Sequence, residues 1–257
     1  QKSGSNKMAI DKSVIDKQRV AASFSRAASS YDRAASLQRD VGAALLATLP
    51  ATMTGLAVDI GCGTGFITGR LLQEHPALAL VALDLADGML QTVQQHYPTV
   101  RCVRADMEQL PLATESADWL LSSLALQWAT EITHCFAEWR RVLKPGGRLL
   151  CSTFLPGTLR ELEQCWRTVD DAVHVNRFVD QNTLVAALQA AGFAQVETVQ
   201  ATHTQYYPQL RALAIDLKAI GAHNMNPGQP AGLTGKQRWA SLQAAYELLR
   251  HERGLPA

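Results

Sequence analysis

Residues 58–66 read VDIGCGTGF, and this stretch decides the fold class of the 257-residue chain. The apolar run LAVDI, typical of a buried strand, leads directly into Gly61, Gly63 and Gly65, and the amphipathic stretch FITGRLLQEH follows at 66–75. Glycine permits a tight turn, and it lets a ligand approach the backbone where a Cβ atom would collide. The sequence therefore predicts a strand, a ligand-binding turn and a helix.

Short apolar runs alternate with amphipathic segments after this turn. We predict strands at 56–60, 78–84, 100–105, 117–123 and 148–154, and helices at 66–75, 87–97 and 132–143. This alternation is typical of a parallel sheet with helices on both faces. Central parallel strands have no wet face, which accounts for their unbroken hydrophobicity. The predicted fold class is therefore α/β, with a doubly wound, mostly parallel sheet.

Helical segments flank this sheet in the sequence. Apolar residues recur at helical spacing over 11–49, and we also predict helices at 182–193, 210–222 and 236–254 and a sixth strand at 195–207. We expect an N-terminal tail and helical lid over 1–50 and a ligand-binding domain over 51–257. In that domain we expect a C-terminal helical insertion, at about 155–180 and 208–254, to bind the substrate.

The charge balance and the cysteines argue against several classes of function. There are 24 Lys and Arg against 23 Asp and Glu, so the chain lacks the global basic field that attracts nucleic acid. No apolar stretch approaches the ~18 residues of a membrane span. The first residues show no positively charged region followed by an apolar run, so we do not expect export. The five cysteines show no zinc-binding spacing. We expect a cytoplasmic monomer with no metal, nucleic-acid or membrane partner.

The spacing of the glycines separates two kinds of nucleotide site. A dinucleotide site of the G-x-G-x-x-G type would need glycine at position 66, which is Phe66 here. The chain instead has G-x-G-x-G, with Asp59 two residues ahead of the first glycine. This arrangement resembles motif I of the class I S-adenosylmethionine methyltransferases. A glycine-rich turn without a ligand is the alternative.

Two more acids follow predicted strands. Asp84 ends the second strand, where a carboxylate can accept hydrogen bonds from both ribose hydroxyls; a helix N-cap is the alternative. Asp106 follows the third strand, and the resemblance implies that it accepts from the adenine amino group; a turn aspartate is the alternative. We assign S-adenosyl-L-methionine, and its product S-adenosyl-L-homocysteine, to Asp59, Gly61, Cys62, Gly63, Gly65, Asp84, Leu85, Met89, Asp106, Met107 and Leu124.

Segments outside the cofactor region carry a narrower resemblance. The stretches are IDKQRVAASFSRAASSYDRAASLQRD, SSLALQW at 122–128, NRF at 176–178, LKAIGAH at 217–223 and GLTGK at 232–236. In order and spacing they resemble the malonyl-acyl-carrier-protein O-methyltransferases of biotin synthesis. The resemblance implies methyl transfer to the free carboxyl of malonyl-acyl carrier protein. Alternatives are a methyltransferase of a small carboxylic acid or a quinone-type carbon on the same fold, and a non-catalytic cofactor sensor.

A carboxylate acceptor is ionised at neutral pH, so the reaction needs neither a metal nor a dedicated base. Arg177 is the first candidate to hold it, because a guanidinium matches a carboxylate bidentately; a surface ion pair is the alternative. Tyr31 could donate from its phenol, or be a core aromatic. Gln127 and Trp128 follow the fourth strand, at the edge where open α/β sheets bind ligands, and are expected to line the pocket.

Late basic residues are candidates for contact with the acidic carrier protein that the resemblance implies. The carrier candidates are Arg211, Lys218, Lys236 and Arg238, and the further substrate candidates are Lys17, near the N-terminus, and His223, near the pocket entrance. Solvated helix faces are the alternative explanation for such charges. Class I methyltransferases finish with an antiparallel seventh strand, whereas this chain finishes at RGLPA directly after a predicted helix. We expect that strand to lie beyond Ala257; a fold that departs from the family is the alternative.

Overall fold

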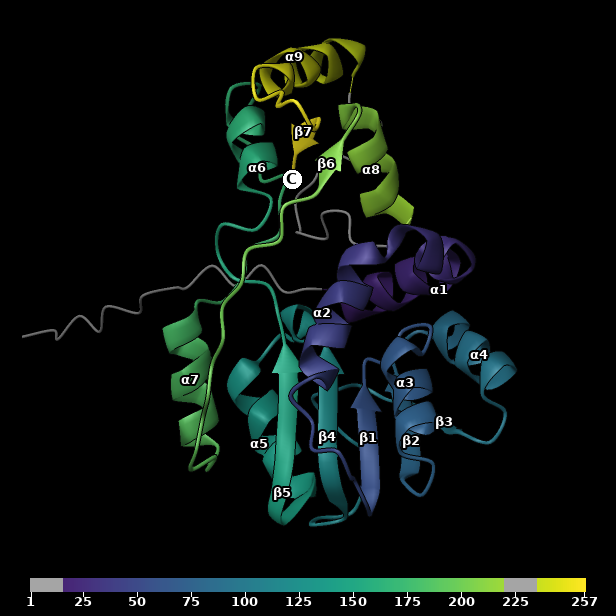
Figure 1. Ribbon diagram of the computed structural model, residues 1–257. Helices are drawn as coiled ribbons and strands as arrows, with labels where there is room; N and C mark the ends of the chain where they lie inside the picture. The colour runs from purple at the N-terminus through teal and green to yellow at the C-terminus, as the bar shows by residue number, and fades with distance from the viewer. Residues whose placement is uncertain (1–15, 220–234) are drawn as a thin grey trace, which may run out of the picture.

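A parallel sheet forms the centre of the molecule. The computed structural model describes residues 16–219 and 235–257 (Figure 1). The five strands of the sheet are β1 (Leu56–Ile60), β2 (Ala79–Asp84), β3 (Arg101–Arg104), β4 (Ala117–Ser123) and β5 (Leu143–Ser152). Their order is β3-β2-β1-β4-β5, and every ladder between them is parallel. The predicted α/β fold with a parallel sheet is confirmed.

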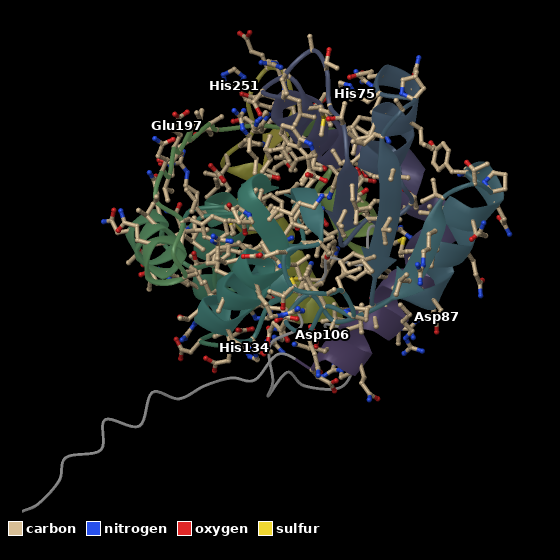
Figure 2. The ribbon with its side chains drawn as sticks, turned by 90° about the horizontal axis from the view of Figure 1, so that it is seen from below. His75, Asp87, Asp106, His134, Glu197 and His251 are labelled. Carbon is tan, nitrogen blue, oxygen red and sulfur yellow. The ribbon has the colours of Figure 1, made fainter. Side chains whose placement is uncertain are left out.

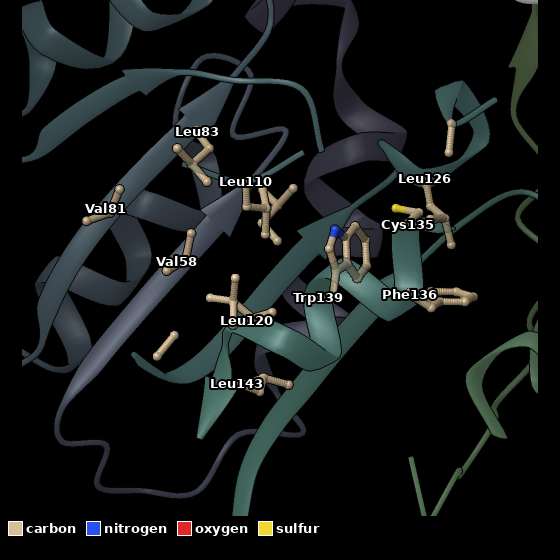
Figure 3. Packing of buried hydrophobic residues seen from close by; sticks show 14 of the residues in the cluster. Val58, Val81, Leu83, Leu110, Leu120, Leu126, Cys135, Phe136, Trp139 and Leu143 are labelled. Atoms are coloured by element: carbon tan, nitrogen blue, oxygen red, sulfur yellow. The ribbon is translucent and has the colours of Figure 1, made fainter. Parts of the chain in front are cut away.

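Helices cover both faces of this sheet. On one face lie α2 (Ser36–Leu46), α3 (Phe66–Glu74) and α4 (Asp87–His96), and on the other α5 (Ile132–Val142) and α7 (Gln181–Ala190). Side chains alternate between two cores along each strand. Val58 and Leu120 pack with Trp139 of α5 (Figure 3), whereas Ala57 and Leu121 belong to the core under α2 and α3. The strands are apolar on both faces because both are covered.

The strand order predicts a ligand-binding crevice at the carboxyl edge of the sheet. Strand β1 pairs with β2 on one side and with β4 on the other, so the strand order reverses beside it. The chain leaves β1 for α3 and, through the one-turn helix η1 (Leu126–Trp128), leaves β4 for α5 on the opposite face. Loops that diverge in this way leave room for a ligand at the switch point.

A helical cap lies above that edge (Figure 1). It consists of α6 (Arg160–Arg167), α8 (Leu210–Ala219), α9 (Lys236–Glu247) and a short antiparallel pair, β6 (Tyr206–Tyr207) and β7 (Leu255–Pro256). The cap has its own core, in which Leu162, Trp166, Leu213, Leu242 and Tyr246 are buried. Helix α1 (Lys17–Ala34) lies between this cap and the sheet.

Three predicted elements differ from the structure. The helical region predicted over 11–49 is divided at Ala35, because α1 packs on α4 and α8 whereas α2 packs on α3, β4 and β5; residues 11–15 lie outside the described residues. The predicted strand at 195–207 is wrong except at β6. Strand backbone needs a paired neighbour, and in the described chain β6 finds only β7, outside the main sheet.

The helix predicted over 236–254 is also too long. Helix α9 ends at Glu247, and a bridge between His251 and Gly254 turns the chain into β7. Gly254 has φ +123°, a conformation that is not helical and that other residues rarely adopt, so a helix cannot extend through this position. Over 16–219 and 235–257, no helix has the length and apolar character needed to cross a membrane.

Candidate functional site

The glycine turn after β1 is shaped by two backbone constraints. The N–H groups of Gly61 and Cys62 both donate to Leu83 O of β2, at 2.8 and 2.9 Å. Gly61 has φ +69°, and a Cβ atom there would lie 2.4 Å from the Cβ of Ala125, so no side chain fits. Gly63 has φ +53°, but no atom lies within 4 Å of where its Cβ would be. The turn is therefore closed at the first glycine and open at the second, where a ligand can reach the backbone.

Asp59 organises the turn from beneath. Its Oδ2 accepts from Thr68 N at 3.1 Å and from Thr68 Oγ1 at 2.6 Å, so it satisfies an N–H in the first turn of α3. The residue is 1% exposed. Burial, with a contribution from the charge of Asp84, raises the pKa of Asp59 to about 7. In this structure Asp59 therefore fixes the helix that follows the turn.

Asp84 links the glycine turn to the end of β2. Its Oδ2 accepts from Gly63 N at 2.9 Å, and its Oδ1 accepts from Ala86 N at 2.8 Å. Burial raises the pKa of Asp84 against these hydrogen bonds. Each oxygen has a second lone pair, so the carboxylate can also accept from two hydroxyl groups. Asp84 is not the N-cap of α4, since that position is Ala86.

Asp106 lies at the end of the neighbouring strand, in an ion cluster. Its Oδ1 accepts from Glu108 N at 3.0 Å, and its Oδ2 accepts from Lys17 Nζ at 2.6 Å. Lys17 Nζ also lies 3.0 Å from Glu108 Oε2. Partial burial lowers the pKa of Lys17, but the two carboxylates more than offset this, and the pKa is raised. Figure 2 shows Asp106 and Asp87 on the side of the molecule where α1 runs.

The turn after β4 completes the crevice. Leu124 has φ +50°, an uncommon conformation for a side-chain-bearing residue, and its N–H donates to Ser152 O at 3.0 Å. Gln127 Nε2 donates to Leu124 O at 2.5 Å. Trp128 meets Phe24 of α1 edge-on, with ring centroids 5.6 Å apart. Gln127 therefore uses its amide nitrogen to brace the backbone, and Trp128 joins the sheet edge to α1.

A cavity of about 1660 Å³ extends from this turn between the sheet edge, α2 and the helical cap. Its walls include Phe24, Tyr31, Leu124, Gln127, Trp128, Phe154, Phe178, Leu213 and Trp239. The aromatic and aliphatic walls suit an apolar chain with a small polar end. Arg177 is exposed and does not line the cavity, although its neighbours Asn176 and Phe178 do.

The remaining predicted cofactor residues lie in the glycine turn or follow β2 and β3. The side chain of Cys62 is buried, and burial raises the pKa of its thiol, so the cysteine offers a ligand its backbone only. Leu85 and Met89 pack beneath α1. Met107 O accepts from Trp139 Nε1 at 2.9 Å. Gly65, with φ +92°, starts α3.

The basic residues predicted to contact the substrate or the carrier differ in their exposure and pairing. Arg211 and Lys218 are exposed on α8, and Lys236 is exposed at the start of α9. Arg238 is paired with Asp170, so its charge is partly neutralised. His223 lies outside the described residues. Lys17, predicted near the substrate, lies instead at the Asp106 end of the crevice.

Sequence reasoning missed two residues that organise the site. Glu108 is 7% exposed and binds Thr130 through the backbone N–H and through Oγ1 at 2.9 Å, which fixes the start of the loop before α5. Phe24 lies seven residues, about two helical turns, before Tyr31. This spacing could have placed both side chains on the cavity side of α1. Within the described residues, 16–219 and 235–257, no group of three His, Cys, Asp or Glu side chains is arranged to hold a metal ion.

Known proteins share this fold. The methyltransferase domain family matches residues 58–151. A methyltransferase of Haloferax volcanii, in complex with the Trm112 activator, superposes with a TM-score of 0.56 at 22% identity, covering 66% of this chain and 75% of that one. An S-adenosylmethionine-dependent methyltransferase of Thermotoga maritima gives 0.54 at 22% identity, covering 68% and 82%. The fold and the site define a class I S-adenosylmethionine-dependent methyltransferase.

Curated relatives narrow the class. The malonyl-[acyl-carrier protein] O-methyltransferase of Hahella chejuensis is 40% identical over 250 residues, covering 96% of this chain and 89% of the relative. That of Laribacter hongkongensis is 42% identical over 259 residues, covering 94% and 86%. A biotin biosynthesis bifunctional protein of Cellvibrio japonicus is 48% identical over 245 residues, and the chain spans 48% of its length. The chain belongs to the malonyl-[acyl-carrier protein] O-methyltransferase family.

Proposed function

We propose that this chain transfers a methyl group from S-adenosyl-L-methionine to the free carboxylate of malonyl-acyl carrier protein, an early step of biotin synthesis. The names of the relatives support this substrate. The observation that carries the proposal is the glycine turn, open at Gly63 and bonded to Asp84, at the same sheet edge as a large aromatic-walled cavity. We further propose that it acts as a cytoplasmic monomer.

The crevice fits the cofactor on three counts. Gly63 leaves open the space that a Cβ would fill, so a ligand can approach its backbone. Asp84 retains acceptor capacity for the ribose hydroxyls, and Asp106, at the next strand end, is assigned the adenine amino group. Leu85 and Met107 are assigned apolar contact with the adenosine. When bound, S-adenosyl-L-methionine supplies an electrophilic methyl group.

The protein's part in the reaction is to align the acceptor carboxylate with the methyl group and to exclude water from the site. Because the acceptor carboxylate is already ionised at neutral pH, no side chain has to remove a proton from it. The walls formed by Phe24, Trp128 and Phe154 keep water away and hold the acyl chain, and such alignment accounts for much of the rate of a displacement reaction. Gln127 supports this alignment by bracing the turn at Leu124.

Two side chains are assigned to the carboxylate. Tyr31 lines the cavity, and its phenol can donate a hydrogen bond without strongly quenching the nucleophile. Arg177 is exposed beside two cavity-lining residues, so a role in anchoring the carboxylate requires its side chain to turn inward from the rim. Arg177→Ala should lose most turnover while retaining cofactor affinity. Full activity of that variant would leave Tyr31 as the anchor.

The cap offers a docking surface for an acidic carrier protein. Arg211 and Lys218 are seven positions apart on α8, so they share one helix face, and both are exposed. Lys236 begins the neighbouring helix of the cap. Such exposed cations attract an acidic partner and speed its association, and added salt weakens this attraction.

A mass-spectrometric assay tests the proposal. The purified protein is incubated with S-adenosyl-L-methionine and one acceptor in each of three reactions. The acceptors are malonyl-acyl carrier protein, malonyl-coenzyme A and free malonate. Malonyl-acyl carrier protein should gain the mass of one methyl group, with stoichiometric S-adenosyl-L-homocysteine. Faster transfer to free malonate would favour the small-acid alternative, and cofactor binding without transfer to any of the three would favour a sensor.

A further inference from the structure

Helix α1 lies across the carboxyl edge of the sheet and contacts the ends of several strands. Gly88 N, at the start of α4 after β2, donates to Ser25 Oγ at 3.2 Å. A Cβ atom on Gly88 would lie 2.5 Å from Ser25 O, so the two backbones approach as closely as glycine allows. Phe24 meets Trp128 after β4. The helix therefore covers the edge from which the cofactor crevice opens.

The first turn of α1 is held by charge. Lys17 Nζ lies 2.6 Å from Asp106 Oδ2 and 3.0 Å from Glu108 Oε2. The side chains of Lys17 and Asp106 are 24% and 32% exposed, and that of Glu108 is 9% exposed. Glu108 is itself fixed by Thr130, so the lysine is tied to a rigid part of the sheet edge.

We propose that Lys17 is a positioning residue that clamps α1 over the adenosine end of the crevice and slows cofactor release. The inference rests on the proposed function, because it takes Asp106 as the acid that faces adenine. A carboxylate oxygen has room for a second donor, so Asp106 can keep Lys17 while it accepts from an amino group. Lys17 therefore retains the ligand instead of competing with it.

The alternative arrangement makes the opposite prediction. If the ammonium group of Lys17 excluded the adenine amino group from Asp106, the ligand would have to displace it, and loss of the lysine would tighten binding. If the cluster only stabilised the fold, its loss would lower the melting temperature without changing the dissociation rate. The sign of the kinetic effect separates these cases.

Stopped-flow measurement of S-adenosyl-L-homocysteine binding tests the clamp. Lys17→Met keeps the apolar stem and removes the charge. Its dissociation rate constant should rise about fivefold, the scale of a partly buried ion pair, while the association rate constant should not fall. Lys17→Arg should restore most of the slow release. Arg19→Met, on the exposed face of the same helix, is the matched control and should release the ligand like the original protein.

Salt provides a second readout. Added salt screens the partly exposed pair, so release from the original protein should accelerate toward that of Lys17→Met, whose own rate should barely change. Dissociation from Lys17→Met at the original rate, or tighter binding by it, would overturn the clamp while leaving the proposed function intact. Failure of the original protein to bind S-adenosyl-L-homocysteine would overturn both.

Discussion

Replacing Asp84 by asparagine removes one acceptor from the centre of the site while preserving its shape. The carboxylate uses Oδ2 for Gly63 N and Oδ1 for Ala86 N, at 2.9 and 2.8 Å. An amide has a single acceptor oxygen, so its nitrogen would face a backbone N–H or would have to turn toward the ligand. Either arrangement costs the bound complex at least one hydrogen bond to a charged acceptor.

The magnitude follows from that count. One hydrogen bond to a charged group contributes about 1.5–3 kcal/mol, so Asp84→Asn should weaken S-adenosyl-L-homocysteine binding by roughly ten- to a hundredfold. The free protein should change much less. There the lost hydrogen bond is offset by relief of burying a carboxylate, whose pKa is raised by that burial. The free energy of unfolding should therefore stay within about 1 kcal/mol of the original.

Isothermal titration calorimetry gives the affinity, and urea denaturation followed by circular dichroism gives the stability. Asp87→Asn is the matched control, because Asp87 pairs with Arg104 at 3.0 Å and both side chains are more than half exposed. Its affinity should be unchanged and its stability within about 0.5 kcal/mol of the original. Unchanged affinity in Asp84→Asn, with an intact fold, would refute the assignment of the ribose hydroxyls to this carboxylate.

Three further changes test other parts of the site. Because the folded-state pKa of Asp59 is raised to about 7, ionisation destabilises the fold as pH rises from about 4 to 7; Asp59→Asn should gain about 1–3 kcal/mol of unfolding free energy over the original at pH 8 and little at pH 4, measured by urea denaturation. Gly61→Ala should cost at least about 2 kcal/mol of stability, because its new Cβ would clash with the Cβ of Ala125, whereas Gly63→Ala, with open space around it, should cost about 1 kcal/mol and lose cofactor affinity instead. Arg211→Glu with Lys218→Glu should raise KM for malonyl-acyl carrier protein but barely change a minimal malonyl thioester, and equal effects on both would place the damage in the fold.

The sequence by itself determined what depends on neighbouring residues. The strands are short apolar runs, and the turn has a positive φ at both 61 and 63, which favours glycine, so both features are visible in the order of amino acids. The acid at the end of β2 was placed in the same way, because the carboxyl ends of parallel strands meet at one edge. The hydrogen bond from Gly63 N to the carboxylate of Asp84 joins residues 21 positions apart.

Only the tertiary structure decided which distant side chains meet. Lys17 and Asp106 are 89 residues apart, and no local pattern couples them; their pairing depends on α1 crossing the sheet edge. The same packing gives Gln127 a backbone partner and leaves Arg177 on the surface. The predicted strand at 195–207 was wrong over 195–204, because alternation describes one chain segment, whereas a strand also needs a partner backbone; here that partner pairs with Gln205 and β6 alone.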